Sequence, residues 1–160
     1  MESIQGKTFV NARAIIERTI DGEKQIVVQF RTKRGQECWE LPGGTIEPYE
    51  SLYIALKREV KEETGLDVTA IMGEDGFFVE NDVECLSPFS VYQTLSGFVN
   101  SIGFHFICHV TGELLTNGDD SSNIKWVGLD ELERIVRQEV FQRIDKVAVM
   151  KYIKLNTEKR

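Results

Sequence analysis

Stretches rich in apolar and β-branched residues fill the first quarter of the chain, and such stretches are typical of strands. Two of them, Thr8 to Ile20 and Lys24 to Arg31, are separated by Asp21-Gly22. Because Asp-Gly readily adopts the positive φ angles of a tight turn, the pattern predicts an antiparallel hairpin. A further short strand, Glu37 to Leu41, leads to Pro42.

The hydrophobic period changes after the turn signal Pro42-Gly43-Gly44. From about Glu50 to Thr64 there is neither Gly nor Pro, and apolar residues recur at helical spacing at Leu52, Ala55, Leu56 and Val60. Gly65 follows and is suited to end a helix in the left-handed conformation. The pattern predicts a helix of about 15 residues, which is about 22 Å long.

The second half of the chain alternates short extended segments with turns and then becomes helical. We expect strands at Asp67 to Met72, Phe77 to Val79, Phe89 to Leu95, Ile102 to Val110 and Ile124 to Val127. Asn81 to Cys85 is expected to be irregular. Asn117 to Asn123 has no apolar residue and is expected to form a surface loop.

Two helices are expected near the carboxyl end. Asp130 is predicted to cap the first, with Glu133 as its capping-box partner. The second runs roughly from Phe141 to Leu155, and the tail of about residues 156–160 is expected to fray. The residues of this second helix that are predicted to face the core are Ile144, Val147, Ala148, Tyr152 and Leu155. Together these elements predict one α/β domain over residues 1–160, in which helices cover both faces of a mixed sheet.

Acidic residues stand in unusual positions on the helix predicted at about Glu50 to Thr64. At about 100° per residue, Glu59 and Glu63 fall within about 20° of the centre of the apolar stripe, and Glu62 lies beside them. A solvated charge run is the ordinary interpretation of such a string. It predicts opposite charges four residues apart, whereas here Glu59 faces Glu63. The last turn is also where the helix dipole disfavours anions.

Local rules that fail together are typical of a functional site. Carboxylates gathered at the edge of a core require a cation, and oxygen ligands suit Mg²⁺ or Mn²⁺. The alternative is an acidic helix with a purely structural role.

The same stretch resembles the Nudix box of the Nudix hydrolases. Gly44, Glu50 and the run Arg58-Glu59-Val60-Lys61-Glu62-Glu63-Thr64-Gly65-Leu66 match the fixed positions of that motif in type and in spacing. The match covers Gly44 to Leu66. Many family members have Gly before the first box Glu, whereas this chain has Tyr49, a difference that bears on the shape of the loop.

The resemblance implies a Nudix-type α/β/α sandwich that hydrolyses a phosphoanhydride bond with Mg²⁺, or with Mn²⁺. The implied substrate is a nucleoside diphosphate linked to another moiety, such as a nucleoside triphosphate or ADP-ribose. The implied metal ligands are Glu59, Glu62 and Glu63, with the Gly44 backbone close by, and Glu63 and Glu59 are the strongest catalytic candidates. Glu50 and Arg58 are expected to orient these carboxylates.

The general base is left open between a box Glu and an acid on a late loop. Asp120 is the preferred late candidate, and Asp119 is its neighbour; both also fit solvated loop acids. Glu80, Asp82 and Glu84 are held in reserve.

Several other polar residues are interpreted more plainly. His105 and His109 share one face of the strand expected at Ile102 to Val110, where solvation is more common than metal binding. Lys33-Arg34 is interpreted as a solvated hairpin tip, with a phosphate contact as the alternative. Trp39 is expected to be part of the scaffold that aims the following loop.

Composition limits the partners. A net charge of −7 argues against a sequence-independent grip on nucleic acid, although it does not exclude an anionic small-molecule nucleotide. No apolar run is long enough for a membrane helix, and the first 16 residues lack the pattern of a secretory signal. Three widely spaced cysteines favour reduced thiols and a cytoplasmic location. The oligomeric state is left open, a homodimer included.

The leading hypothesis is therefore a metal-dependent pyrophosphohydrolase. The alternative is a regulatory Nudix domain that binds a nucleotide without cleaving it, and gaps in the box carboxylates would favour that alternative. The box in this chain has no such gap.

Overall fold

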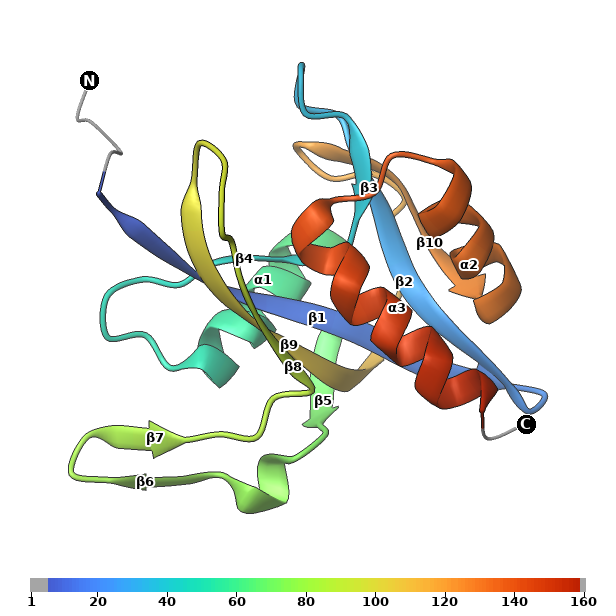
Figure 1. Cartoon of the computed structure of the whole chain (residues 1–160). Coiled ribbons are helices and arrows are strands. Elements are labelled where there is room, and N and C mark those ends of the chain that lie inside the picture. Colours follow the sequence, from blue (N-terminus) through green and yellow to red (C-terminus); the bar gives the residue numbers. More distant parts are fainter. Residues whose placement is uncertain (1–5, 159–160) are drawn as a thin grey trace.

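The computed structural model describes residues 6–158, and Figure 1 follows the chain from blue to red. Its strands are β1 (Thr8–Ile20), β2 (Glu23–Arg31), β3 (Cys38–Glu40), β4 (Gly43–Thr45), β5 (Asp67–Ile71), β6 (Phe78–Glu80), β7 (Val83–Cys85), β8 (Ser90–Gln93), β9 (Asn100–Thr111) and β10 (Ser121–Gly128). Its helices are α1 (Leu52–Thr64), α2 (Leu129–Gln138), α3 (Arg143–Thr157) and the short 3-10 turn η1 (Glu74–Gly76).

Strands β10, β2, β1, β9 and β5 are neighbours in that order in one mixed sheet. The long strand β1 is central: it pairs in parallel with β9, from Thr8 opposite Asn100 to Ile16 opposite Cys108, and antiparallel with β2 and β4. Strand β3 extends the sheet beside β2, and β8 pairs with β9. The predicted α/β fold with a mixed sheet is confirmed.

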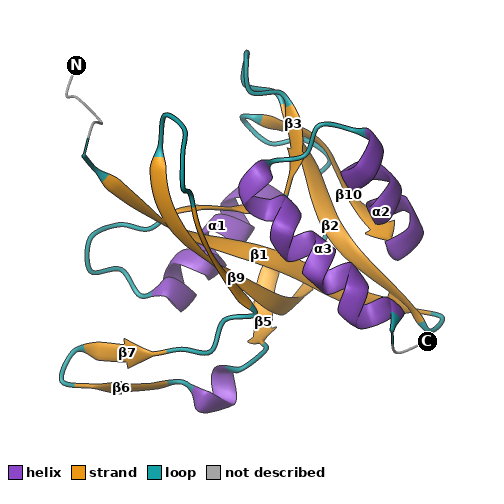
Figure 2. Cartoon of the chain, viewed as in Figure 1, coloured by secondary structure: helices purple, strands orange, loops and turns teal. Residues whose placement is uncertain are grey.

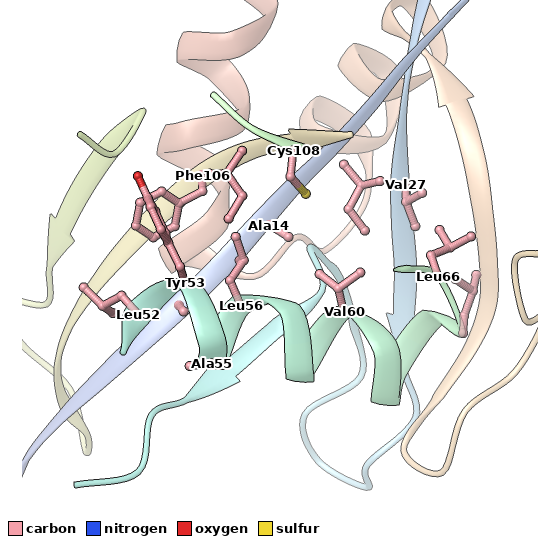
Figure 3. Close-up of a cluster of buried hydrophobic side chains, with 14 residues drawn as sticks. Ala14, Val27, Leu52, Tyr53, Ala55, Leu56, Val60, Leu66, Phe106 and Cys108 are labelled. Atoms are coloured by element: carbon pink, nitrogen blue, oxygen red, sulfur yellow. The ribbon is translucent and has the colours of Figure 1, made fainter. Parts of the chain in front are cut away.

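Helices cover both faces of this sheet, as Figure 2 shows. Helix α1 packs on one face through the cluster drawn in Figure 3, in which Leu52, Leu56 and Val60 meet Ala14 and Phe106. Helices α2 and α3 pack on the other face, against a second buried cluster. The sandwich is therefore built from two cores that share the sheet.

Strand β1 serves both cores because successive side chains of a strand point to opposite faces. Ala12, Ala14 and Ile16 belong to the core beneath α1, whereas Ile15 belongs to the core beneath α3. The small residues Ala12 and Ala14 let α1 approach the sheet closely. Arg13 points to the α3 side, where it needs a buried partner.

That partner is Asp145, in the first turn of α3. Arg13 Nε and Nη2 donate to the two Asp145 oxygens at 3.0 and 2.6 Å. His105 Nε2 lies 2.8 Å from Asp145 Oδ1, and because a carboxylate only accepts, this nitrogen carries the proton. The Leu41 amide donates to Asp145, and the Leu41 carbonyl accepts from Arg13. This network joins β1, β9 and α3 to the segment before Gly43.

The network corrects the expectation for His105. It was interpreted as a solvated strand residue, yet it is fully buried against Asp145. Helix α3 covers this face of β9, and the local sequence around His105 gives no sign of that covering helix. His109, by contrast, is exposed and lies 3.0 Å from Glu17.

Three further local expectations are wrong. Residues 81–85 are not wholly irregular, because β7 forms a hairpin with β6. Helix α2 begins after Gly128 with no side-chain cap, so the proposed Asp130–Glu133 capping box is absent. Two of the predicted inward residues of α3 are exposed, Val147 at 72% and Leu155 at 40%, because the helix turns Val149 and Ile153 inward instead.

The ends of the chain test the terminal expectations only in part. Helix α3 ends at Thr157, two residues beyond the predicted Leu155, and the fraying of the tail stays a prediction. Residues 1–5 and 159–160 lie outside the described part of the chain. Within residues 6–158, no helix combines the length and apolar character needed to cross a bilayer.

The buried network predicts an acid-sensitive stability. Burial disfavours the charged form of Asp145, but Arg13 and His105 outweigh it and lower the pKa of the carboxyl from 3.8 to about 2. A depressed pKa means that the stabilisation is present above about pH 4 and is lost as the pH falls towards 2. The difference amounts to about 2 kcal/mol. Asp145→Asn should destabilise the protein at pH 7 by about 3–5 kcal/mol, because Arg13 stays buried without its partner. It should also flatten the pH dependence.

Chemical denaturation at several pH values, on the wild type and Asp145→Asn, measures both effects. Asp130→Asn, at an exposed acid of α2, is the control. Equal acid sensitivity in Asp145→Asn and the wild type would contradict the assignment.

Candidate functional site

A cavity of about 790 Å³ lies where α1, the strand β4 and the loop before β10 meet. This volume is typical of small-molecule sites. All the sequence candidates of the box except Glu50 and Arg58 line it: Gly44, Glu59, Glu62 and Glu63. Asp119 and Asp120 line it as well. The fold therefore brings the box and the late loop to one cavity.

The three acids at the end of α1 differ in exposure. The Glu59 side chain is 13% exposed and that of Glu62 is 59% exposed. Glu63 is partly buried, between the sheet and the β4 segment. The helical periodicity that set Glu59 and Glu63 on the inward stripe thus agrees with their depth, and Glu62 stands at the rim.

Glu63 is the most constrained of these acids. Its Oε2 accepts from the Gly43 amide at 2.8 Å and from Gln29 Nε2 at 3.3 Å. Burial raises the pKa of Glu63 to about 7, against the opposing effects of Arg13 and the Gly43 amide, while Glu40 and Glu59 add to the rise. A buried carboxylate among other acids is a site where positive charge is favoured.

Arg58 holds two of the box acids in place. Its Nε and Nη2 donate to the Glu50 carboxylate at 2.8 and 3.0 Å, and its Nη1 donates to Glu59 at 2.9 Å. Its Nη1 also lies 3.5 Å from Glu62. The hydrogen bonds from Arg58 lower the pKa of Glu50 to about 2. Glu50 therefore orients Arg58, and Arg58 orients Glu59.

Two glycines fit this arrangement for different reasons. A Cβ on Gly43, whose φ is +148°, would lie 2.4 Å from the Ala12 carbonyl oxygen. A Cβ on Gly44 would lie 2.6 Å from the Glu59 carboxyl group. Gly43 thus lets the backbone approach β1 and donate to Glu63, whereas Gly44 leaves open the space beside Glu59. The predicted turn at Pro42-Gly43-Gly44 is wrong for the glycines: only Pro42 is a bend, and Gly43 and Gly44 are the first residues of β4, paired with Arg13 and Ala12 of β1.

Tyr49 takes the left-handed conformation, with a φ of 63° and a fully exposed side chain. This backbone conformation favours Gly. Tyr49 therefore stands at a position whose backbone conformation favours glycine, and its effect on the shape of the loop stays a prediction.

The N-terminus of α1 is capped from a distance. Ser51 makes no side-chain cap of its own, and Glu84 of β7 accepts from Ser51 Oγ at 2.6 Å and from the Leu52 amide at 2.7 Å. Glu84, a reserve candidate for the general base, is thus engaged at the opposite end of the helix from Glu63. Glu80 and Asp82 are exposed on the same hairpin and do not line the cavity.

The late loop lies against the end of α1. A Cβ on Gly118 would lie 3.5 Å from the Glu63 carbonyl oxygen, and the Asp120 carbonyl accepts from the Thr32 amide at 2.9 Å. Asp119 and Asp120 are exposed at the cavity. Of the basic turn after β2, Gln36 lines the cavity, whereas Lys33 and Arg34 do not.

The floor of the cavity contains residues that no motif indicated. Arg13, Gln29 and Glu40 are buried and line it. Gln29 Nε2 donates to both Glu40 and Glu63, at 3.3 Å each. The available signal was the same for all three: each is a polar or charged residue within an otherwise apolar strand segment.

Glu59 and Glu63 are each paired with a neighbouring donor in this arrangement. Among residues 6–158, no three His, Cys, Asp or Glu side chains are grouped closely enough to hold a metal ion. The donor chemistry nevertheless fits a hard divalent cation, since the carboxylates supply oxygen ligands and Gly44 leaves the space beside Glu59 free. Assignment of Glu59, Glu62 and Glu63 as ligands stays a prediction.

Carboxylates from the end of α1 and the backbone of Gly43 and Gly44 thus line one cavity. Comparison with known families agrees: the NUDIX domain model matches residues 9–147. The chain therefore belongs to the NUDIX family and is a Nudix hydrolase.

Individual relatives are distant. An RNA pyrophosphohydrolase of Rickettsia africae is 27% identical over 136 residues, which cover 79% of this chain and 83% of that protein. A chain from a structural study of MutT from Aliivibrio salmonicida and Vibrio cholerae superposes with a TM-score of 0.68 at 21% identity, over 93% of this chain and 99% of that one. The NUDIX domain of Shewanella oneidensis NrtR, complexed with ADP ribose, superposes with a TM-score of 0.65 at 16% identity, over 96% and 88%.

The two glycines should respond differently to substitution by alanine. Gly43→Ala should lose at least about 2 kcal/mol of stability, because the new Cβ meets backbone and the φ angle is unfavourable for it. Gly44→Ala should lose less than about 1 kcal/mol, because the atoms it meets belong to a movable side chain. Urea denaturation of both variants tests this. Equal losses would contradict the distinction between backbone and side-chain contacts.

Glu84→Gln should destabilise the protein by about 1 kcal/mol, because it weakens the cap of α1. Glu80→Gln, on the same hairpin but exposed, is the control and should stay near the wild type. Thermal denaturation compares the two. A loss in Glu80→Gln as large as in Glu84→Gln would mean that the hairpin as a whole, rather than the cap, is responsible.

Proposed function

We propose that this Nudix hydrolase cleaves a phosphoanhydride bond in a nucleoside diphosphate linked to another moiety, and that it requires Mg²⁺ or Mn²⁺. The observation that carries the proposal is the placement of Glu59, Glu62 and Glu63 in one cavity with Gly43 and Gly44 of β4. Two similar proteins, an RNA pyrophosphohydrolase and a NUDIX domain complexed with ADP ribose, support the same bond type.

The carboxylates of Glu59, Glu62 and Glu63 would hold the divalent ion. When bound, such an ion neutralises charge on phosphate oxygens and increases the acidity of water. Arg58 keeps the Glu59 carboxylate directed towards the cavity, and the Gly43 amide does the same for Glu63. The bare backbone at Gly44 leaves room for a phosphate beside these acids.

Asp120 is assigned to the attacking water. Its exposed carboxylate lines the same cavity and is free to accept a proton from that water. Asp119 lines the cavity too and provides a matched comparison. The cytoplasmic location inferred from the cysteines forms part of the proposal, since intracellular nucleotides would be the substrates.

Release of phosphate or nucleoside monophosphate should be measured with nucleoside triphosphates, ADP-ribose, nucleotide sugars, dinucleoside polyphosphates and a 5′-triphosphate RNA oligonucleotide. Each is tested with Mg²⁺, with Mn²⁺ and with chelator. We expect metal-dependent turnover of a small nucleotide in preference to the RNA, in line with the net charge of −7. Tight nucleotide binding without any product would instead support the regulatory alternative.

Glu63→Gln should lower kcat by two or more orders of magnitude, because losing a group that stabilises transition-state charge costs about 2.7–4 kcal/mol. Glu59→Gln should lose nearly as much. Glu113→Gln, at an exposed acid outside the cavity, is the control. Steady-state assays and thermal melts with and without Mg²⁺ measure the effect. Wild-type activity in Glu63→Gln would remove the metal-site assignment.

Asp120→Asn should lower kcat while leaving the Mg²⁺-induced rise in Tm largely intact, because Asp120 is assigned to the water. Asp119→Asn should have the smaller effect of the two. The same assays and melts compare them. If Asp119→Asn lowers kcat and Asp120→Asn does not, the assignment passes to Asp119.

A further inference from the structure

The cavity extends well beyond the box, along one face of β1. Arg13, Asn11 and Phe9 follow one another at every second position, so they share that face, and all three line the cavity. Arg13 pairs in register with Gly43, and Phe9 is four residues away, which is about 13 Å along a strand. A phosphate held near Gly43 therefore leaves a bound nucleotide pointing along β1 towards Phe9.

The far end of the cavity is closed by the loop between β8 and β9, residues 94–99. Phe9 lies beside Ser101 in the sheet, and Thr94 accepts from the Ser101 amide through its hydroxyl at 2.9 Å. Phe98 and Val99 of this loop line the cavity. The Phe98 side chain is nevertheless 88% exposed, so it lines the cavity without being packed in a core.

The loop of residues 94–99 is held to α3 by contacts with Arg143. Arg143 Nη2 donates to the Ser96 carbonyl at 2.7 Å. Gly97 has a φ of +108°, and a Cβ there would lie 2.5 Å from the same Arg143 nitrogen. Thr94 Oγ1 also donates to the Val99 carbonyl at 3.2 Å. These contacts hold the residues on either side of Phe98.

Resting on the proposed function, we infer that Phe98 stacks on the base of the bound nucleotide and that Arg143 is a positioning residue for the loop. An aromatic ring on a fastened loop offers a flat apolar face with little conformational entropy to lose on binding. Stacking tolerates different bases, and discrimination between them falls to polar groups such as Asn11, whose amide is held by Tyr92 and Thr45.

The test separates base from phosphate. Adenosine, guanosine, cytidine and uridine monophosphates, and ribose 5-phosphate, are titrated by calorimetry into the wild type and into Phe98→Ala, Phe98→Trp and Leu95→Ala. Leu95 is the matched control, because it is 89% exposed on the same loop but does not line the cavity. Phe98→Ala should weaken at least one nucleoside monophosphate about tenfold, within the range of base–aromatic stacking.

Ribose 5-phosphate should bind equally to all four proteins, and Phe98→Trp should restore the nucleotide affinity. For the cleaved substrate, Phe98→Ala should raise KM and leave kcat nearly unchanged. The stacking role is wrong if Phe98→Ala and Leu95→Ala have the same affinity for nucleotides. It is also wrong if Phe98→Ala loses as much affinity for ribose 5-phosphate as for the nucleotides. Calorimetry measures binding without requiring hydrolysis. If the wild type hydrolyses nothing, only the proposed function is contradicted. If the wild type binds no nucleotide, this inference is contradicted.

Arg143→Ala tests the positioning role. If Arg143 acts by holding the loop, Arg143→Ala should weaken nucleotide binding about as much as Phe98→Ala does. The double variant should then bind nucleotides only slightly more weakly than Phe98→Ala. Additive losses, or weaker binding of ribose 5-phosphate to Arg143→Ala, would assign Arg143 to direct contact with the phosphate and overturn the positioning role.

Discussion

The buried pair between Arg13 and Asp145 is the interaction on which the cavity depends. It lies between the central strand and α3, and both partners also hold the backbone of Leu41. Leu41 immediately precedes Pro42 and Gly43, whose amide in turn fixes Glu63. A buried ion pair is weak evidence for stability as such, because desolvation offsets much of its attraction. Here the consequence of the ion pair is positional: it sets where the start of β4, at Gly43, meets the end of α1.

Helix α3 consequently acts on both ends of the cavity from its first turn. Asp145 accepts from the Leu41 amide, two residues before Gly43. Arg143, two residues earlier on the helix, donates to the Ser96 carbonyl in the loop between β8 and β9. The same helix therefore positions both ends of the cavity, the end lined by carboxylates and the end lined by Phe98. This arrangement suits a substrate that carries phosphates at one end and a base at the other.

The fold was largely accessible from the sequence, because its signals are local. Strand β1 has the predicted bounds, and α1 differs from its predicted start by two residues, since both follow directly from hydrophobic period and glycine position. Errors arose where a partner distant in sequence decides the outcome. His105 is buried only because α3 covers β9, and Glu84, a reserve candidate for the general base, instead caps α1 from β7.

The sequence by itself determined the chemical part of the site: the spacing of Glu59 and Glu63 sets both on the inward side of α1 whatever that helix packs against. The sequence also marked Gly43 and Gly44, but the reasons for glycine there are tertiary: Gly43 approaches the backbone of β1, and Gly44 lies beside Glu59. Only the tertiary structure decided the rest of the cavity. Arg13, Gln29 and Glu40 come from three strands, and Phe98 and Arg143 from a loop and a helix far apart in the chain. Their proximity is fixed by strand register and helix packing, which are long-range contacts that no local pattern encodes.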